Sequence, residues 1–258
     1  MNEVIDVLMK RRSIRAYTKQ QISAEVRAEI LKATLRAPTA GNMMLYSIVE
    51  VTDRKIKDRL AVSCDDQPFI ARAPMVWLFI ADYQRWFDYF LASGVEELCR
   101  QKQVPMRKPE EGDLFLACCD ALIAAQNAVV AAESFGIGSC YIGDIMEQYE
   151  IHKELFDLPQ YTFPIGLLVF GYPTPEQLRR PYTKRFDEKF VVFENQYHRL
   201  DEQELKEMFA EHEDRMSKGQ NKEGIANFGQ AMYTHKFNAD FSVEMSRSVR
   251  LILEHWLK

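Results

Sequence analysis

The segment from Asp113 to Phe135 constrains the fold more than any other part of the sequence, because its apolar and small residues repeat at intervals of three and four. That spacing predicts one long helix with a continuous apolar face. Much of the face is alanine, so another backbone can approach it closely, as in a helix at the centre of a domain or a dimer. Gly136 follows and is suited to end the helix in the left-handed conformation. The face consists of Leu114, Cys118, Ala121, Ala125, Ala128, Ala132 and Phe135.

Apolar runs elsewhere predict the strands of a sheet. Pro74–Ala81 is apolar without alternation, which indicates a central strand buried on both faces. The other expected strands are Leu45–Val51, Ser139–Gly143 and Phe163–Gly171. Further helices are expected after the capping residues Asn2, Ser23 and Asp53, and over 201–216 and Asp240–Lys258. The pattern predicts a single α+β domain spanning residues 1–258, in which about 195–258 form a helical C-terminal arm.

Composition excludes several classes of protein. With 33 Lys and Arg against 38 Asp and Glu, the net charge of −5 gives no general attraction to nucleic acid or to an anionic membrane. The longest uninterrupted apolar run, Ala73–Ala81, is far shorter than the ~20 residues of a membrane span. The acidic start Met1–Asp6 is unlike a secretory signal. The cysteines contain no C-x-x-C pair, and we expect a reduced, cytoplasmic protein without nucleic-acid or membrane partners.

The usual catalytic signatures are missing from the sequence. Gly136-Ile137-Gly138 lacks the third glycine of a dinucleotide fingerprint, and neither a Walker loop nor a G-x-S-x-G elbow occurs. None of the five histidines stands at the H-x-x-x-H spacing of a zinc site. We therefore expect no metal and no protein nucleophile.

A basic cluster, Arg11-Arg12-Ser13-Ile14-Arg15, has two interpretations. Its cations could simply solvate the C-terminal carbonyls of the first helix. Alternatively, guanidinium groups and a serine hydroxyl could form a cradle for a phosphate, to which they offer bidentate and neutral donors. Further basic pairs at Arg179-Arg180 and Lys184-Arg185 are open to the same two interpretations.

Taken together, several segments resemble the FMN-dependent nitroreductase family, in particular its oxygen-insensitive nitroreductase and flavin reductase P group, which favours NADPH. The resemblance covers most of the chain up to about Asn195. It implies an α+β fold in which helices flank a mixed sheet, and an intertwined homodimer with FMN at the interface. The C-terminal helix with Trp256 is expected to pack on the partner subunit. The matching segments are Arg11–Thr18, Pro38–Asn42, Gln67, Ala124–Asp144, Leu158–Pro173 and Phe193–Tyr197.

The resemblance also implies which residues bind the cofactor. Arg11 and Ser13 would hold the FMN phosphate together with Lys184-Arg185, and Arg15 would lie by N1 and O2 of the flavin ring. Thr39–Gly41 would approach from the partner subunit, and the backbone N–H near Asp144 would lie close to N5. The complete implied set is Arg11, Arg12, Ser13, Arg15, Thr39, Ala40, Gly41, Gln67, Tyr141, Ile142, Gly143, Asp144, Lys184 and Arg185.

The sequence departs from the family pattern at three places. Thr39-Ala40-Gly41 stands where relatives are often rich in serine, and Asp144 replaces a glycine that is common after Tyr-Ile-Gly. Where NADPH-specific relatives bind the 2′-phosphate with arginines, this chain offers Lys218 and Lys222 beside Glu223. A lysine grips phosphate less specifically than an arginine fork, so use of NADPH or NADH is left open.

The implied activity is that of an FMN-dependent NAD(P)H oxidoreductase with ping-pong kinetics. Hydride would pass through flavin N5 to a small electron-poor aromatic acceptor such as a nitroaromatic, a quinone or a free flavin. Two alternatives stay open: another reaction of a specific metabolite on the same flavin scaffold, and a non-catalytic flavin-binding protein.

Overall fold

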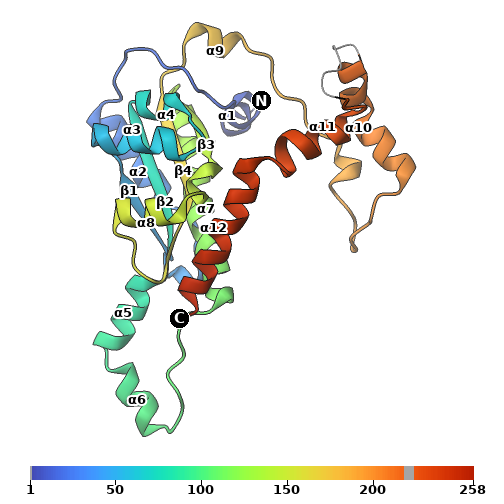
Figure 1. Ribbon diagram of the computed structural model, residues 1–258. Helices are drawn as coiled ribbons and strands as arrows, with labels where there is room; N and C mark the ends of the chain where they lie inside the picture. Colours follow the sequence, from blue (N-terminus) through green and yellow to red (C-terminus); the bar gives the residue numbers. More distant parts are fainter. Residues whose placement is uncertain (1, 218–223) are drawn as a thin grey trace. The chain divides into compact units, whose positions relative to one another are not determined.

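The computed structural model describes residues 2–217 and 224–258, which form two compact units (Figure 1). Unit 1 comprises Met1–Arg180 and Glu244–Lys258, and unit 2 comprises Pro181–Val243. The predicted strands are all present in unit 1, as β1 (Tyr46–Glu50), β2 (Met75–Asp82), β3 (Gly138–Ile142) and β4 (Thr162–Gly171).

The four strands form a sheet in the order β1-β2-β4-β3, and every neighbouring pair is antiparallel. A parallel bridge joins Ser13 to Ser139, so the parallel element expected of a mixed sheet is reduced here to a bridge. All eight residues of β2 are buried, as the absence of alternation in its sequence predicted. The α+β class is confirmed.

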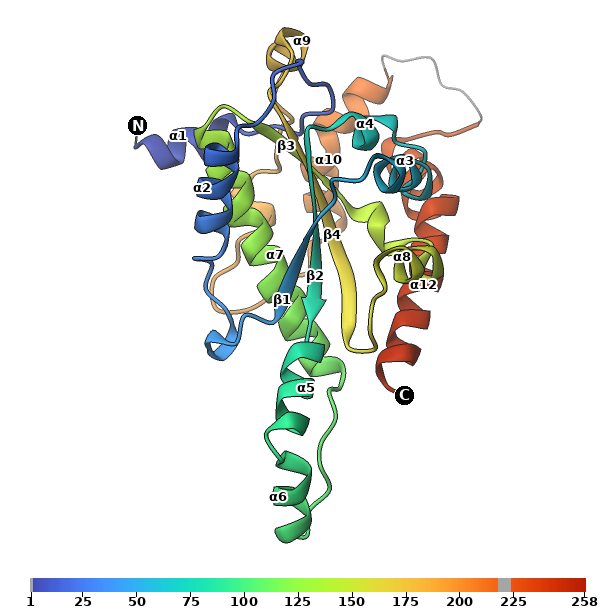
Figure 2. The same ribbon diagram turned by 90° about the vertical axis from the view of Figure 1, so that its left-hand side faces the viewer.

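Helices cover both faces of the sheet in unit 1 (Figures 1 and 2). Alternate residues of β2 point to opposite faces, so Val76 packs in a cluster with α3 and α4 while Trp77 packs in a cluster with α2 and α7. The helices of unit 1 are α1 (Glu3–Lys10), α2 (Ala24–Thr34), α3 (Arg54–Ser63), α4 (Pro68–Arg72), α5 (Gln84–Ala92), α6 (Val95–Gln101), α7 (Glu111–Ser134), α8 (Tyr149–Phe156) and α9 (Pro175–Arg179), with 3-10 turns η1 (Ala40–Asn42) and η2 (Gly143–Met146).

The predicted caps explain where three of these helices begin. Asn2, Ser23 and Asp53 each accept a hydrogen bond from a backbone N–H in the first turn of the helix that follows. Gly136 has a φ of 70° directly after α7, as expected of a residue that ends a helix in the left-handed region.

Unit 2 contains η3 (Glu188–Phe190), α10 (Glu202–Ser217), α11 (Phe228–Met232) and η4 (Tyr233–Phe237). Its small apolar centre is an aromatic cluster in which Phe209 packs against Phe186 and Phe228, with His212 beside all three.

The last helix, α12 (Asp240–Trp256), returns to unit 1. Trp256 is 1% exposed, and its ring meets Tyr161 of the same chain edge to face, with the centroids 5.6 Å apart. The expectation that Trp256 packs on a partner subunit is therefore wrong. An amphipathic pattern identifies the apolar face of a helix but not the surface that covers it.

Helix α7 is the structural centre of unit 1. By length and composition α7 could also cross a membrane, although polar residues interrupt its apolar sequence. In the structure one face packs on α2 and the sheet, and the alanines predicted to form that face are buried, whereas Phe135 is exposed. The close helix–sheet approach that small residues permit is confirmed.

Asp120 on α7 fixes the segment before β1. Its carboxylate is buried and accepts hydrogen bonds from the backbone N–H groups of Ala40, at 2.9 Å, and Leu45, at 3.0 Å. Asp120→Ala would leave both buried N–H groups without an acceptor, and each costs roughly 1–3 kcal/mol. We expect a loss of about 2–4 kcal/mol of unfolding free energy in urea denaturation, because water partly replaces the carboxylate. Asp120→Asn keeps one acceptor oxygen and should lose less; equal stability of all three proteins would contradict this role.

Candidate functional site

The basic segment is held against the free edge of the sheet. The backbone N–H of Ile14 donates to the Ser139 carbonyl at 2.9 Å, beside the Ser13–Ser139 bridge. Ile14 is buried, and any side chain at Gly138 would collide with it. Glycine at 138 therefore allows the close approach that places Arg11 and Arg15 at β3.

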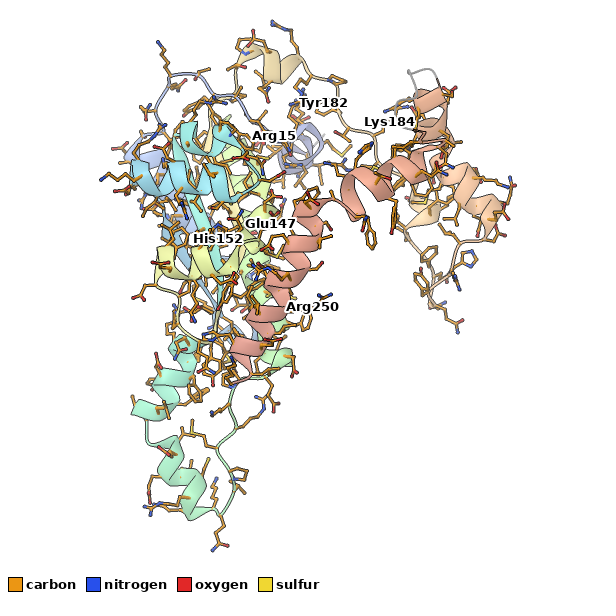
Figure 3. All side chains as sticks on the ribbon, in the orientation of Figure 1. Arg15, Glu147, His152, Tyr182, Lys184 and Arg250 are labelled. Carbon is orange, nitrogen blue, oxygen red and sulfur yellow. The ribbon has the colours of Figure 1, made fainter. Side chains whose placement is uncertain are left out.

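Three segments distant in sequence converge around Arg15, which Figure 3 labels. The Arg15 guanidinium carbon lies 5.8 Å from the centroid of the Phe69 ring on α4. Gln67, which precedes α4, donates from Nε2 to Asp144 Oδ2 at 2.7 Å and to the Cys64 carbonyl at 2.8 Å. The start of the chain, the α3–α4 connection and the end of β3 thus share one surface.

Two arginines on this surface are not neutralised by ion pairs within the described part of the chain. Within residues 2–217 and 224–258, neither Arg11 nor Arg15 forms an ion pair. The charge of Arg11 acts on Glu133, but burial raises the Glu133 pKa to about 7, so the Glu133 charge is only partial at neutral pH. Two cations without a full counter-charge are suited to an anionic ligand.

Arg12 has a different task from its neighbours. Its Nη1 donates to the backbone carbonyls of Leu178, at 2.7 Å, and Arg180, at 2.5 Å. This guanidinium therefore binds carbonyls at the C-terminal end of α9. Binding to helix carbonyls was one of the two interpretations of the basic cluster, but the helix expected there was the first one, α1. The cofactor-binding role that the resemblance implies for Arg12 stays a prediction.

The end of β3 provides an open surface beside the arginines. Tyr141 is 36% exposed although it lies in a strand, while Ile142 is buried beneath it. A Cβ at Gly143 would meet no atom within 4 Å, so packing within the chain does not require a glycine there. Asp144 follows in η2 and is half-buried. An exposed ring beside unfilled space is what a flat ligand needs.

Thr39, Ala40 and Gly41 lie at the other end of the sheet. They precede β1, whose first residue Tyr46 pairs with Ala81 at the end of β2, whereas Gly138 pairs with Gly171 at the opposite end of β4. Ala40 is tied to Asp120 there. The structure therefore does not bring 39–41 together with Arg11 and Arg15 of the same chain.

The remaining predicted residues belong to unit 2 or lie outside the described residues. Lys184 Nζ is 2.6 Å from Glu211 Oε1 within unit 2, and Arg185 is exposed. Lys218 and Lys222 lie outside the described residues. The phosphate and 2′-phosphate roles of these four residues stay predictions.

Sequence reasoning missed a buried polar group next to Asp144. Glu147 and His152 are both buried, and the His152 Nε2 lies 2.8 Å from Ser63 Oγ. Asp144 and Glu147 stand three residues apart across a 3-10 turn, a spacing that could have suggested contact between the two carboxyls.

Helices cover both faces of the sheet, and Arg11 and Arg15, which form no ion pair among the described residues, lie beside the exposed end of the edge strand β3. These features define an α+β protein suited to a flat anionic ligand. Residues 8–172 match the nitroreductase family. The chain is 31% identical over 205 residues to the oxygen-insensitive NADPH nitroreductase of Salmonella typhimurium, covering 80% of this chain and 79% of that protein. It is 32% identical over 222 residues to the FMN reductase [NAD(P)H] of Bacillus subtilis, covering 86% and 84%. The solved structure of B. megaterium NfrA2 has a TM-score of 0.79 and 27% identity, covering 99% of this chain and 98% of that one.

The chain belongs to the nitroreductase family. The resemblance expected from Arg11–Thr18 and the other motifs is thereby confirmed.

Proposed function

We propose that the protein is an enzyme, an FMN-dependent NAD(P)H oxidoreductase. The observation that carries this is the convergence of Arg11, Arg15, Gln67 and the end of β3 on one surface, where neither arginine forms an ion pair among the described residues. The relatives named as FMN reductase and NADPH nitroreductase support the same chemistry. When bound, FMN would take a hydride from NADPH or NADH and pass it to a small electron-poor aromatic acceptor, such as a nitroaromatic, a quinone or a flavin.

The residues present fit FMN in charge and shape. Arg11 and Ser13 would bind the phosphate, and the family resemblance names Lys184 and Arg185 as further candidate phosphate ligands. Arg15, held on Phe69, would place a fixed positive charge at the pyrimidine edge of the ring, where charge accumulates on reduction. The ring edge and face would be lined by Gln67, Tyr141, Ile142, Gly143 and Asp144. In this proposal residues 1–258 act as one functional domain, and its location is cytoplasmic.

An exposed apolar face on α7 supports a homodimer. Its members recur at intervals of three and four along one side of α7, and Phe115, the most exposed, is 69% accessible. We call these residues the α7 outer face: Phe115, Leu116, Cys119, Leu122 and Ile123. A second copy covering this face could also supply the Thr39–Gly41 segment that the chain cannot bring to its own arginines.

Flavin binding and turnover test the proposed function directly. Purified protein with added FMN should quench flavin fluorescence at a saturable site, and NADPH or NADH should bleach the bound flavin in anaerobic stopped-flow measurements run in parallel. Protein that neither binds FMN nor oxidises either nicotinamide would refute the proposal. Tight FMN binding without reduction by either donor would instead indicate a non-catalytic flavin protein.

A further inference from the structure

Glu147 is a buried carboxyl group surrounded by acids. It is 3% exposed, and its Oε1 has no hydrogen-bond partner. Its carboxyl group lies within hydrogen-bonding reach of the Asp144 carboxyl, and the charges of Asp65, before α4, and Glu244, on α12, also act on it. The acids therefore come from three separate parts of unit 1.

Among the described residues, the charges that act on Glu147 all come from acids. His152 on α8 lies close to Glu147 (Figure 3), but burial lowers its pKa, so the imidazole is neutral. Cys64 faces the same group, and burial together with the two carboxylates raises its thiol pKa. The nearby arginines are otherwise engaged: Arg247 binds Glu150 and Glu244, and Arg59 acts on His152.

A carboxyl group in such a place keeps its proton. Two carboxyl groups in hydrogen-bond contact cannot both be ionised at low cost, because the like charges repel and burial removes the water that would solvate them. Burial, followed by the hydrogen bond and charge of Asp144, raises the Glu147 pKa to about 8. At neutral pH Glu147 therefore carries the proton and donates it to Asp144.

The second member of the pair reaches the candidate flavin surface. Asp144 is half-buried and accepts a hydrogen bond from Gln67, the residue next to α4, on which Arg15 is held. A proton on Glu147 is thus one transfer away from a carboxylate at the edge of the ligand site, while Glu147 itself is shielded from water.

We propose that Asp144 and Glu147 hold one proton between them, and that this proton is delivered from Asp144 to the electron acceptor during its reduction. The inference rests on the proposed function. A quinone that has received a hydride has gained two electrons and one proton, and its second oxygen still needs a proton. The Glu147 O–H bond breaks as Asp144 is protonated, and the Asp144 O–H bond breaks as the new O–H bond forms on the acceptor. Asp144 then takes a proton from water, which restores the singly protonated pair.

In this proposal Asp144 is the catalytic acid and Glu147 is a positioning residue that supplies the proton. A carboxylate beside an electron-accepting ring is unfavourable by itself, and the proton held on Glu147 limits the charge of the pair to −1.

Infrared difference spectroscopy of the protein without flavin tests the shared proton independently of activity. At pH 7 the wild-type protein should show the C=O stretch of a protonated carboxylic acid, and raising the pH through about 8 should remove it. Glu133 is also partly protonated at pH 7 and adds to this band. Glu147→Gln should therefore lose the Glu147 component of the band, whereas Glu150→Gln, which changes an exposed carboxylate on the neighbouring helix, should keep the whole band. Absence of the band in wild-type protein at pH 7 would overturn the proposal even if neither variant folded.

Stopped-flow kinetics of the flavin-loaded enzyme then tests delivery of the proton. Reoxidation of the reduced enzyme by a quinone should slow as pH rises through about 8, because the pair loses its proton there. Asp144→Asn and Glu147→Gln should slow reoxidation about 100-fold at pH 7 and remove this pH dependence, since a general acid contributes roughly 100-fold or more. Reduction by NADPH, which needs no proton from the protein, should change less than about threefold, and Glu150→Gln should match wild type. Equal slowing of both half-reactions would refute proton delivery, whereas a failure to bind FMN would refute the proposed function instead.

Discussion

Replacing Arg15 with alanine is expected to weaken the binding of reduced FMN more than that of oxidised FMN, and so to lower the midpoint potential of the bound flavin. The Arg15 guanidinium lies over Phe69 and forms no ion pair among the residues described, so its charge is available to the ligand. A hydrogen bond to a charged group contributes roughly 1.5–3 kcal/mol, and 1.4 kcal/mol corresponds to about 30 mV for a two-electron couple. The expected decrease is therefore about 30–60 mV, measured by equilibration with a redox dye of known potential.

Arg72→Ala is the matched control for this measurement. Arg72 is an exposed residue of α4, and its charge acts on Tyr17 as that of Arg15 does. Its removal takes away one nearby positive charge without touching the proposed ring contact, so the potential should move by less than half as much. If Arg15→Ala lost affinity equally for oxidised and reduced FMN, Arg15 would bind the cofactor without favouring its reduced form, and the prediction would be contradicted.

Local features of the sequence predicted the elements of the fold because the signals are local. The unbroken apolar run from Pro74 to Ala81 became the fully buried β2, and the alanine face of Asp113–Phe135 became the buried side of α7. Capping is equally local, since Asn2 and Ser23 bond to the first turn of the helix that each precedes. These features depend on residues close together in the chain, so periodicity and residue type suffice to find them.

Features that depend on packing between distant segments could not be predicted in this way. The pair of Ser63 and His152 exists because α3 and α8 cover the same face of the sheet, and neither residue lies in a motif. The charge of Glu244 on α12 acts on Glu147, and Trp256 of the same helix is buried against Tyr161, so both interactions join segments that are far apart in the chain. The family resemblance implied a set of flavin-binding residues, which stays a prediction, but it did not imply the carbonyl contacts that engage Arg12.

The position of Thr39–Gly41 also depends on packing between distant segments, and it bears on whether two copies of the chain form the flavin site together. Their separation from Arg11 and Arg15 follows from strand register, which the sequence does not encode within any single segment. If these residues contact flavin, they must do so on a second copy of the chain. Flavin binding and dimer formation should then be lost together.

Glutamates at two positions of the α7 outer face test that connection. Leu122 and Ile123 are each 41% exposed, whereas the alanines of α7 around them are buried. The double variant Leu122→Glu/Ile123→Glu should be monomeric in size-exclusion chromatography with light scattering, because burying a large apolar side chain contributes about 1.5–3 kcal/mol and burying an unpaired carboxylate costs more. The combined penalty in the dimer exceeds about 4 kcal/mol, so we expect FMN affinity to fall by more than about 100-fold.

Val62→Glu is the control, since Val62 is an exposed apolar residue on α3, a helix on the opposite face of the sheet. It should leave both the dimer and FMN affinity unchanged. Circular dichroism must show that the double variant keeps its helices, which is expected because both positions are already partly exposed within the subunit. A folded monomer that binds FMN as tightly as wild type would place the whole flavin site within one chain, and Thr39–Gly41 would then have no role in it. A double variant that stays dimeric would move the subunit interface away from α7, leaving its exposed apolar face without the partner that its pattern predicts.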